Sequence, residues 1–388
     1  MRQGHHGMLP DNTQDEFSRQ SFVQSLKLHL ARQVSPRLKL SYEQKVRPAF
    51  EKQHKRAPKS RHEVHDGMLR DGNFQMWSSL QRTSQELKQD SQTEIAFRQI
   101  DRLADRARKL VRGSNRVTVR SKPDLAIPRY ATAVDIHTIP GGYHNELIND
   151  DVMTGAVYDP GVWLYSMGRM GAYNEDIGAT LISFLKGKHP GFRPKRILDM
   201  GCAVGHSTLP YTDAYPDAEI HALDIAGPMV RYGAARAASL GKAVQFSQQN
   251  AEATDYPDGF FDLIVSHILL HETSHKGLRN IVRESHRLLA PGGLMIHAET
   301  PSYGKLADPY DQFILDWDTY YNNEPYWGPL KDEVLRVITA AAGFKRENYF
   351  EQVQPSAVGG EHARNRTRLF QGGDFGGAGA WFLWGAAK

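Results

Sequence analysis

Two segments of the chain carry residues whose types and spacing could do chemistry. The first, DMGCAVGHST (199–208), places Asp199 in front of a turn that holds Gly201 and Gly205. Glycine suits a backbone that turns sharply and lets a ligand lie against it. The turn reads G-x-x-x-G and so departs from the G-x-G-x-x-G dinucleotide fingerprint. A carboxylate at Asp199 would repel pyrophosphate, but it would attract a cation such as an α-ammonium group.

The second segment, SHILLHETSH (266–275), is rich in histidine. His267, His271, Glu272 and His275 are candidates for proton transfer, because imidazole titrates near neutral pH. His271 is the preferred general base, since it follows a predicted strand where the loop would face a ligand; a structural histidine bonded to loop backbone is equally compatible. The same residues could hold a metal ion, but we predict none.

Alternating strands and helices are predicted to position these segments. Short apolar runs predict strands at 196–200, 219–224, 243–249, 260–267, 294–300, 344–352 and 380–388, and helical patterns lie at 227–241, 277–293 and 331–343. This alternation predicts a parallel sheet covered on both faces, and the last two runs predict a hairpin that inserts one antiparallel strand. Ligands of such sheets bind outside the carboxyl ends of the strands. Asp224, at the end of the second strand, is therefore placed to accept hydrogen bonds from a ribose diol.

In these motifs the chain resembles the class I S-adenosylmethionine-dependent methyltransferases, over about residues 190–388. The resemblance is carried, in order, by LDMGCAVG, HALDIAGPM, QQNAEATDYPDGFFDLIVSH and RLLAPGGLMIHAET. It implies a Rossmann-like seven-stranded, mostly parallel sheet with an antiparallel last strand, and S-adenosyl-L-methionine as the cofactor. The cofactor-binding residues that it implies are Asp199, Gly201, Cys202, Ala203, Gly205, Asp224, Ile225, Asn250, Ala251 and Ser266. Ala203 stands where many relatives have glycine.

Aromatic residues gather in segments that could surround a methyl acceptor. In this fold an insertion such as 301–329 commonly covers the acceptor, and GGYHNE (141–146) and VYDPGVWLY (157–165) could close the other side. The predicted acceptor is small and aromatic or otherwise apolar, and it is methylated on O, N or S. Its predicted contacts are Tyr143, Tyr158, Tyr165, Trp317 and Tyr321, with His271, His267 and Glu272 as the catalytic candidates. Packing of the same rings against the N-terminal part of the chain is an equally compatible interpretation.

The N-terminal part of the chain has a different pattern. Residues 1–125 are predicted to form a helical subdomain, 126–189 a Pro-, Gly- and aromatic-rich connection packed on the cleft, and 190–388 the methyltransferase domain. Within the first of these, the start to residue 35 is expected to be loosely held. The strongest helical signal spans 72–110, with apolar residues at Leu80, Leu87, Ile95, Leu103 and Leu110 and a stop at Gly113.

Composition and charge exclude several classes of protein. The 388 residues are 40% hydrophobic and 24% charged, which excludes collagen-like and wholly disordered chains. No apolar run predicts a membrane span or a secretory signal, and one cysteine cannot form an internal disulfide, so a cytoplasmic protein without a membrane partner is expected. Residues 1–124 carry a net charge of about +11 and the rest about −7.

Two alternatives to small-molecule methylation stay open. One is an RNA methyltransferase that binds through the basic N-terminal half, although basic and acidic residues are interspersed there. The other is a non-catalytic methyltransferase-like binding protein. A homodimer is also left open. The basic run HARNRTRLF (362–370) could contact an anionic group or form a solvated loop.

Overall fold

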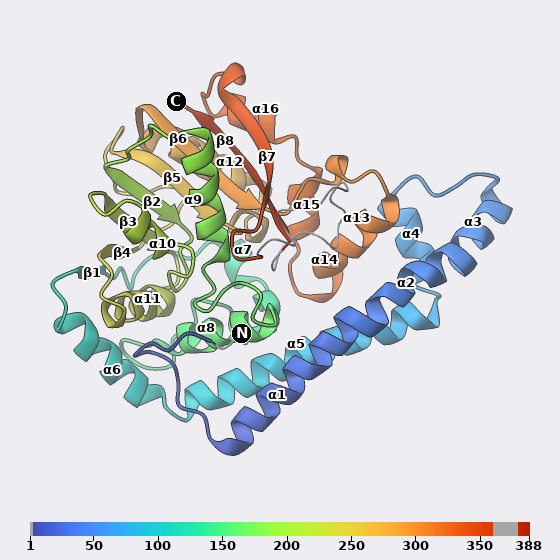
Figure 1. Cartoon of the computed structure of the whole chain (residues 1–388), viewed down its shortest axis with the longest axis horizontal. Helices are drawn as coiled ribbons and strands as arrows, with labels where there is room; N and C mark the ends of the chain where they lie inside the picture. Colours follow the sequence, from blue (N-terminus) through green and yellow to red (C-terminus); the bar gives the residue numbers. More distant parts are fainter. Residues whose placement is uncertain (1–2, 360–378) are drawn as a thin grey trace.

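A single mixed sheet organises the C-terminal half of the chain. The computed structural model describes residues 3–359 and 379–388, so the segment 362–370 lies outside the described residues. Eight strands follow the order β1-β4-β3-β2-β5-β6-β8-β7 (Figure 1). Their bounds are β1 Val117–Arg120, β2 Arg196–Met200, β3 Glu219–Asp224, β4 Val244–Gln248, β5 Phe261–His267, β6 Leu289–Glu299, β7 Tyr349–Pro355 and β8 Ala380–Ala387.

The predicted Rossmann-like architecture is confirmed, with one correction. Strand β8 runs antiparallel to both of its neighbours, β6 and β7, while the remaining pairings are parallel. The sheet has eight strands rather than seven, because β1 adds a parallel edge strand beside β4. This strand lies within residues 1–125, which were predicted to form a helical subdomain.

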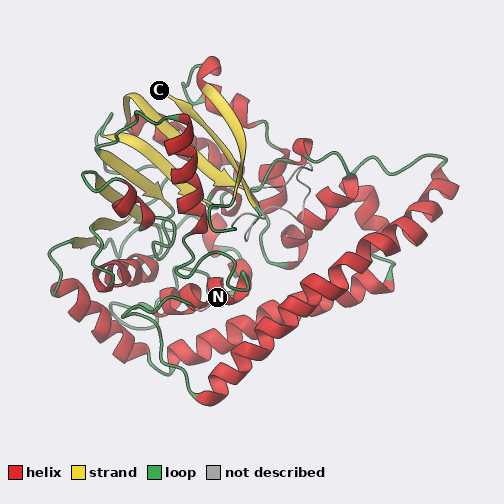
Figure 2. Cartoon of the chain, in the orientation of Figure 1, coloured by secondary structure: helices red, strands yellow, loops and turns green. Residues whose placement is uncertain are grey.

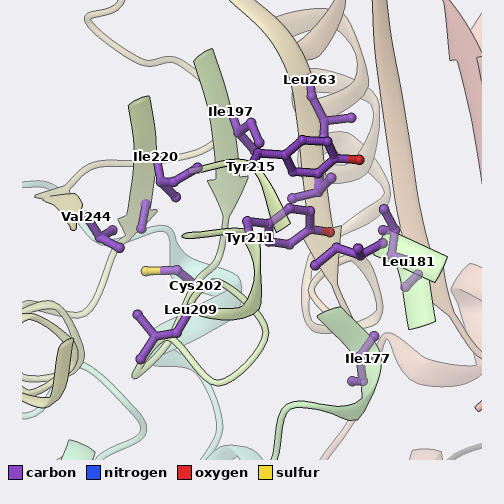
Figure 3. Packing of buried hydrophobic residues seen from close by; sticks show 14 of the residues in the cluster. Ile177, Leu181, Ile197, Cys202, Leu209, Tyr211, Tyr215, Ile220, Val244 and Leu263 are labelled. Carbon is purple, nitrogen blue, oxygen red and sulfur yellow. The ribbon is translucent and has the colours of Figure 1, made fainter. Parts of the chain in front are cut away.

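Helices cover both faces of the sheet, as a parallel sheet requires. On one face lie α9 (Asp176–Lys188), α10 (Pro210–Ala214) and α11 (Gly227–Ser239), and on the other lie α12 (His275–Leu288) and α16 (Leu335–Ala341). Figure 3 shows the first layer, in which strand residues such as Ile197 and Leu263 pack with Leu181 of α9 and Tyr211 of α10. The strands are therefore held rigidly where their carboxyl ends form a site.

Residues 14–54 are more ordered than the sequence indicated. Helical turns run without a break through α1 (Gln14–His29), η1 (Leu30–Val34), α2 (Ser35–Ser41), η2 (Tyr42–Val46) and α3 (Arg47–His54), which form the long blue rod in Figure 1 and the outer red rod in Figure 2. The expectation of a loosely held start is therefore wrong for residues 14–35. A capping box between Thr13 and Glu16 begins the rod, and π-helical turns precede Pro36 and Pro48, which lets the rod accommodate both prolines.

The strong helical signal over 72–110 corresponds to two helices, after the short α4 (Arg61–Met68). These are α5 (Gly72–Phe97) and α6 (Ile100–Arg112), and Gly113 caps α6 as predicted. The predicted apolar face of α5 is wrong at Leu80 and Leu87, which are exposed. The buried face instead carries polar residues, among them Gln85, Lys88 and Gln89.

The remaining helices are mostly short and lie in the middle of the chain, in the 301–329 insertion and in two turns of the C-terminal half. These are α7 (Arg129–Thr132), η3 (Ile136–Thr138), α8 (Met153–Tyr165), η4 (Leu270–Glu272), η5 (Tyr303–Lys305), α13 (Pro309–Leu315), α14 (Trp317–Tyr321), α15 (Trp327–Asp332) and η6 (Arg346–Asn348). Phe74 and Trp77 of α5 pack with Phe313 and Trp317 of the insertion, so the insertion is joined to the N-terminal helices. No helix among the described residues is both long and apolar enough to cross a membrane.

Candidate functional site

A cavity of about 90 Å³, here called the donor cavity, lies at the carboxyl ends of β2, β3, β4 and β5. It contains six of the residues predicted to bind the cofactor: Gly201, Ala203, Asp224, Ile225, Asn250 and Ala251. Tyr130, Tyr143 and Tyr158, from the segment before β2, line the same cavity. Its volume is below the roughly 300–1,000 Å³ of typical ligand pockets.

The turn after β2 owes its shape to three residues in the left-handed region. Gly201 and Gly205 have φ values of 71° and 79°, and Ala203 has 46°. The left-handed φ favours glycine at Gly201, and a Cβ atom there would also displace the tip of the Leu269 side chain, 2.6 Å away. Ala203 carries a conformational cost at the position where many relatives have glycine.

An Ala203→Gly variant is expected to be more stable than the unchanged chain by about 0.5–1 kcal/mol, because relief of about 1–2 kcal/mol of left-handed strain exceeds the roughly 0.5–1 kcal/mol entropic cost of glycine. Urea unfolding without cofactor would measure this difference. As a control, Ala237→Gly in the right-handed helix α11 should lose stability. A loss of stability in Ala203→Gly as well would contradict the strain argument.

Asp224 is held in place with its carboxylate at the donor cavity. The backbone N–H of Ala203 donates to Oδ2 at 2.9 Å, and that of Ala226 donates to Oδ1 at 2.9 Å. Each oxygen keeps a lone pair for a further donor. Burial raises the pKa of Asp224 to about 6, although these two N–H groups act in the opposite direction. A ribose diol could supply the missing donors.

Asn250 and Ala251, predicted to contact adenine, follow β4 and line the donor cavity. The amide oxygen of Asn250 accepts the N–H of Glu252 at 2.9 Å. That bond fixes the side chain and leaves a second lone pair on the oxygen, which an adenine amino group could use.

Asp199 is not among the residues that line the donor cavity, and its predicted ammonium contact stays a prediction. Its buried carboxylate accepts a hydrogen bond from Thr208 Oγ1 at 2.5 Å and lies 3.1 Å from His267 Nδ1. His267, by contrast, lines the donor cavity. The carboxylate thus acts first on the protein itself, by orienting His267.

Two more predicted cofactor residues, Cys202 and Ser266, also point away from the donor cavity. Cys202 belongs to the apolar cluster under the sheet (Figure 3), and burial raises the pKa of its thiol well above the usual value. Ser266 is buried, with Oγ 2.7 Å from His297 Nδ1. Neither side chain reaches the cavity, so any cofactor contact from them would be through backbone.

A second cavity, of about 440 Å³ and here called the acceptor cavity, adjoins the first. The two cavities share four lining residues, which are Tyr143, Tyr158, Ile268 and Glu272. The acceptor cavity also contains Tyr165 and His271 from the predicted site. It is closed by α1 and α5 on one side and by the 301–329 insertion on the other.

The acceptor cavity is more charged than the predicted apolar acceptor suggests. Lys27 and Lys88 lie near the ring of Tyr165, with Nζ atoms 4.6 and 5.4 Å from its centroid. Burial lowers the pKa of Lys27 to about 8 and that of Lys88 to about 7. Asp318 and Glu324 line the same space, and burial raises the pKa of Asp318 to about 7.

His271 and Glu272 lie at the junction of the cavities. His271 Nδ1 is 2.8 Å from Glu299 Oε2, and Tyr143 Oη donates to Glu272 Oε1 at 3.1 Å. Burial alone would lower the pKa of His271, but Glu299 and the neighbouring carboxylates more than offset this and raise it. The general-base role of His271 stays a prediction.

Two predicted acceptor contacts serve packing instead. Trp317 lies edge-on to Trp77 and donates from Nε1 to Ser78 Oγ at 2.9 Å. Tyr321 packs beside Phe74 and Trp317. Neither residue lines the acceptor cavity, so the alternative interpretation, packing against the N-terminal helices, holds for these two rings.

The sequence interpretation missed several residues that line the acceptor cavity. His137 comes from η3 in the supposed connection, and Lys27, Gln85, Lys88 and Gln89 come from the N-terminal helices. No short motif marks them, because their neighbours in space are distant in sequence. The one signal that could have marked them is the set of polar residues at helical spacing in α5, which are Gln85, Lys88 and Gln89.

Comparison with known proteins identifies the same part of the chain. The model of the family described as "Methyltransferase domain" matches residues 197–293. Demethylmenaquinone methyltransferase of Thermus thermophilus is 30% identical over 166 residues, covering 39% of this chain and 74% of the relative. The ubiquinone/menaquinone biosynthesis C-methyltransferase UbiE of Ectopseudomonas mendocina is 30% identical over 183 residues, covering 42% of this chain and 70% of the relative.

Among solved structures, phosphoethanolamine N-methyltransferase 2 of Haemonchus contortus, in complex with phosphomonomethylethanolamine and S-adenosylhomocysteine, is 15% identical with a TM-score of 0.42. That match covers 60% of this chain and 57% of the other. The curated relatives, the family model and the donor cavity at the strand ends all indicate a methyltransferase. The chain is an enzyme of the class I S-adenosylmethionine-dependent methyltransferases.

Proposed function

We propose that this methyltransferase acts on a small molecule that binds in the acceptor cavity and receives the methyl group across the wall shared with the donor cavity. The observation that carries the proposal is the set of four residues common to both cavities: Tyr143, Tyr158, Ile268 and Glu272. Methyl transfer is an in-line displacement, which needs the reacting atoms about 3–3.5 Å apart. Adjoining cavities allow that approach.

The lining of the acceptor cavity supports an acceptor with an aromatic body and an acidic group. The rings of Tyr143, Tyr158, Tyr165 and Trp327 offer apolar surface. Lys27 is buried, and its Nζ has no hydrogen-bond partner among the described residues. A buried ammonium group without a partner is costly, and an acceptor carboxylate would supply one. The relatives named for quinone methylation make a hydroxylated ring a suitable first acceptor to test.

The test uses the full chain, labelled S-adenosylmethionine and pairs of hydroxylated aromatic compounds that differ by one carboxylate. We expect methylated product, detected by mass spectrometry, with the acid preferred over its neutral partner. Salt-sensitive retention of RNA with no small-molecule product would favour the RNA methyltransferase instead. Binding of S-adenosylhomocysteine without any product would favour the non-catalytic alternative.

A Lys27→Met variant is expected to raise KM for the acidic acceptor about 10–100-fold, because a hydrogen bond to a charged group contributes about 1.5–3 kcal/mol. The value of kcat should change little, and KM for the neutral partner should not change. Lys45→Met, at an exposed lysine of the same helical rod, is the matched control. Equal KM values for Lys27→Met and the unchanged chain would contradict the proposed acidic group.

The ion pairs of the N-terminal helices support a small acceptor over RNA. Many arginines there are paired with acids, for example Arg19 with Glu94 and Arg98 with Glu16. Arg61 contacts Asp316 of the insertion at 2.9 Å. Paired guanidinium groups are poor phosphate ligands, so the net charge of this half does not by itself form a nucleic-acid surface.

A further inference from the structure

We propose that His137, His271 and Glu272 bind one divalent transition-metal ion at the junction of the donor and acceptor cavities. Each residue offers one ligand atom, and these atoms lie within 4.8 Å of one another. Glu272 lines both cavities, and both histidines line the acceptor cavity. Two imidazoles and one carboxylate form a ligand set that suits Zn²⁺ and Fe²⁺ and leaves coordination positions open.

His271 is oriented as a metal-binding histidine would be. Its Nδ1 lies 2.8 Å from Glu299 Oε2, and Glu299 is fixed in turn, because its other oxygen accepts the N–H of Leu270 at 2.8 Å. Donation from Nδ1–H leaves a lone pair on Nε2. A carboxylate behind the histidine is the usual second partner of such ligands, and it fixes both the tautomer and the ring.

His137 has the same arrangement from the opposite side. Its Nδ1 lies 3.1 Å from Glu324 Oε1, and its Nε2 lies 3.4 Å from Glu272 Oε1. The Asn322 amide nitrogen lies 2.9 Å from the same Nδ1, but its two N–H groups have acceptors in Asp318 Oδ1 at 3.0 Å and Glu324 Oε1 at 2.7 Å. With Nδ1–H directed at Glu324, the lone pair of Nε2 faces Glu272.

The backbone of His137 is held by the N-terminal helices. Its φ of 51° is in the left-handed region, which costs a histidine conformational energy. The His137 carbonyl oxygen accepts hydrogen bonds from Gln85 Nε2 at 3.2 Å and Gln89 Nε2 at 2.9 Å. These two bonds account for two of the buried polar residues of α5, and they fix the backbone that carries the His137 ring.

An unpartnered oxygen points independently to a missing cation. Glu324 Oε2 is buried and has no hydrogen-bond partner among the described residues, although it lies 3.6 Å from His271 Nε2. A bare carboxylate oxygen in the interior is costly. An ion held by the two histidines and Glu272, or a water bound to that ion, would satisfy it.

The ion would act on the acceptor, and this part of the proposal rests on the proposed function. A hydroxyl oxygen of the acceptor could occupy an open position, where the charge of the ion lowers its pKa. The proton leaves to solvent, the bond between that oxygen and the methyl carbon forms, and the sulfur–methyl bond breaks. The products are the methylated acceptor and S-adenosylhomocysteine.

Residues 271–275 have the letters H-E-x-x-H, yet His275 is not part of the cluster. The segment divides between the 3-10 turn η4 and the start of α12. His275 is exposed, and its Nδ1 lies 2.6 Å from Glu333. It is therefore a matched control: a histidine of the same segment that should not bind the ion.

The test is a titration of tag-free, chelator-stripped full chain with Co²⁺ and Zn²⁺, followed by calorimetry and by the visible absorption of Co²⁺, without any acceptor. We expect one ion per chain, affinity at least about 100-fold weaker in His137→Ala and His271→Ala, and no change in His275→Ala. S-adenosylhomocysteine binding should be retained in all three variants, which shows that they fold.

Absence of a bound ion, or equal ion binding by His137→Ala and the unchanged chain, would overturn the metal site. Either result would leave the proposed function standing, since product formation is measured separately. Conversely, ion binding that depends on His137 and His271 would support the site even if no tested acceptor is methylated.

Discussion

An Asp224→Ala variant is expected to bind S-adenosylhomocysteine at least about 100-fold more weakly than the unchanged chain. The N–H groups of Ala203 and Ala226 hold the carboxylate of Asp224 at the donor cavity. Two ribose hydroxyls can each donate to it, and a hydrogen bond to a charged group contributes about 1.5–3 kcal/mol. Losing two such bonds therefore costs 10²-fold or more in affinity. Isothermal titration calorimetry would measure the affinity of both chains for S-adenosylhomocysteine.

The pH dependence of the same binding tests the charge of Asp224. Because burial raises its pKa to about 6, the carboxyl group of the unliganded chain becomes protonated below that pH and loses acceptor capacity. Affinity should therefore be constant above about pH 7 and fall towards tenfold per pH unit below pH 6. Asp224→Asn, which cannot titrate, should bind weakly without this slope. A similar slope in the Asn variant would assign the effect to another group.

The largest expected loss of stability comes from Asp159 of α8. Its buried carboxylate lies 2.9 Å from His6 Nε2, 2.8 Å from His206 Nε2 and 3.2 Å from Arg236 Nε, and Tyr232 Oη donates to it at 3.1 Å. Burial alone would raise its pKa, but Arg236 and His206 hold it well below the usual value. Removing one partner from such a cluster leaves buried charge uncompensated, at a cost of about 3–5 kcal/mol.

Asp159→Ala should accordingly lower the free energy of unfolding by that amount, as measured by urea unfolding followed by circular dichroism. Asp217→Ala, at an exposed aspartate, should stay within about 0.5 kcal/mol of the unchanged chain. Asp159→Asn keeps the shape but not the charge, so it should lose less than the alanine variant. Comparable stability for Asp159→Ala and Asp217→Ala would show that the cluster contributes no net stability.

Most strands of the sheet could be predicted closely from the sequence, but the run at 294–300 starts five residues after the beginning of β6, where a helix was predicted, and the run at 344–352 starts five residues before β7. The runs at 196–200 and 219–224 match β2 and β3 to the residue, because strands buried on both faces are continuously apolar between polar ends. The glycine turn and Asp224 follow from the same pattern, since ligands gather at the carboxyl ends of parallel strands. β1 was missed because four residues between Pro- and Gly-rich segments give too short a signal.

The parts that could not be predicted depend on contacts between distant segments. Thr208 and His267 both reach the carboxylate of Asp199, and only the folded turn reveals this. The exposed Leu80 and Leu87 misled the prediction for α5, because its inner face lines a cavity and so is polar. Likewise, the position of His137 beside His271 depends on its contacts with α5 and with the 301–329 insertion, which are distant in sequence.

The two cavities are lined largely by different segments of the chain, so substrate preference could change in evolution while cofactor binding is kept. Residues after β2, β3, β4 and β5 supply most of the donor wall, whereas much of the opposite chamber comes from the N-terminal rod, α5, α8 and the insertion. Exchanging the N-terminal rod, α5 and the insertion between homologues should therefore transfer substrate preference. Helix α8 has to stay, because it lines the donor wall as well through Tyr158.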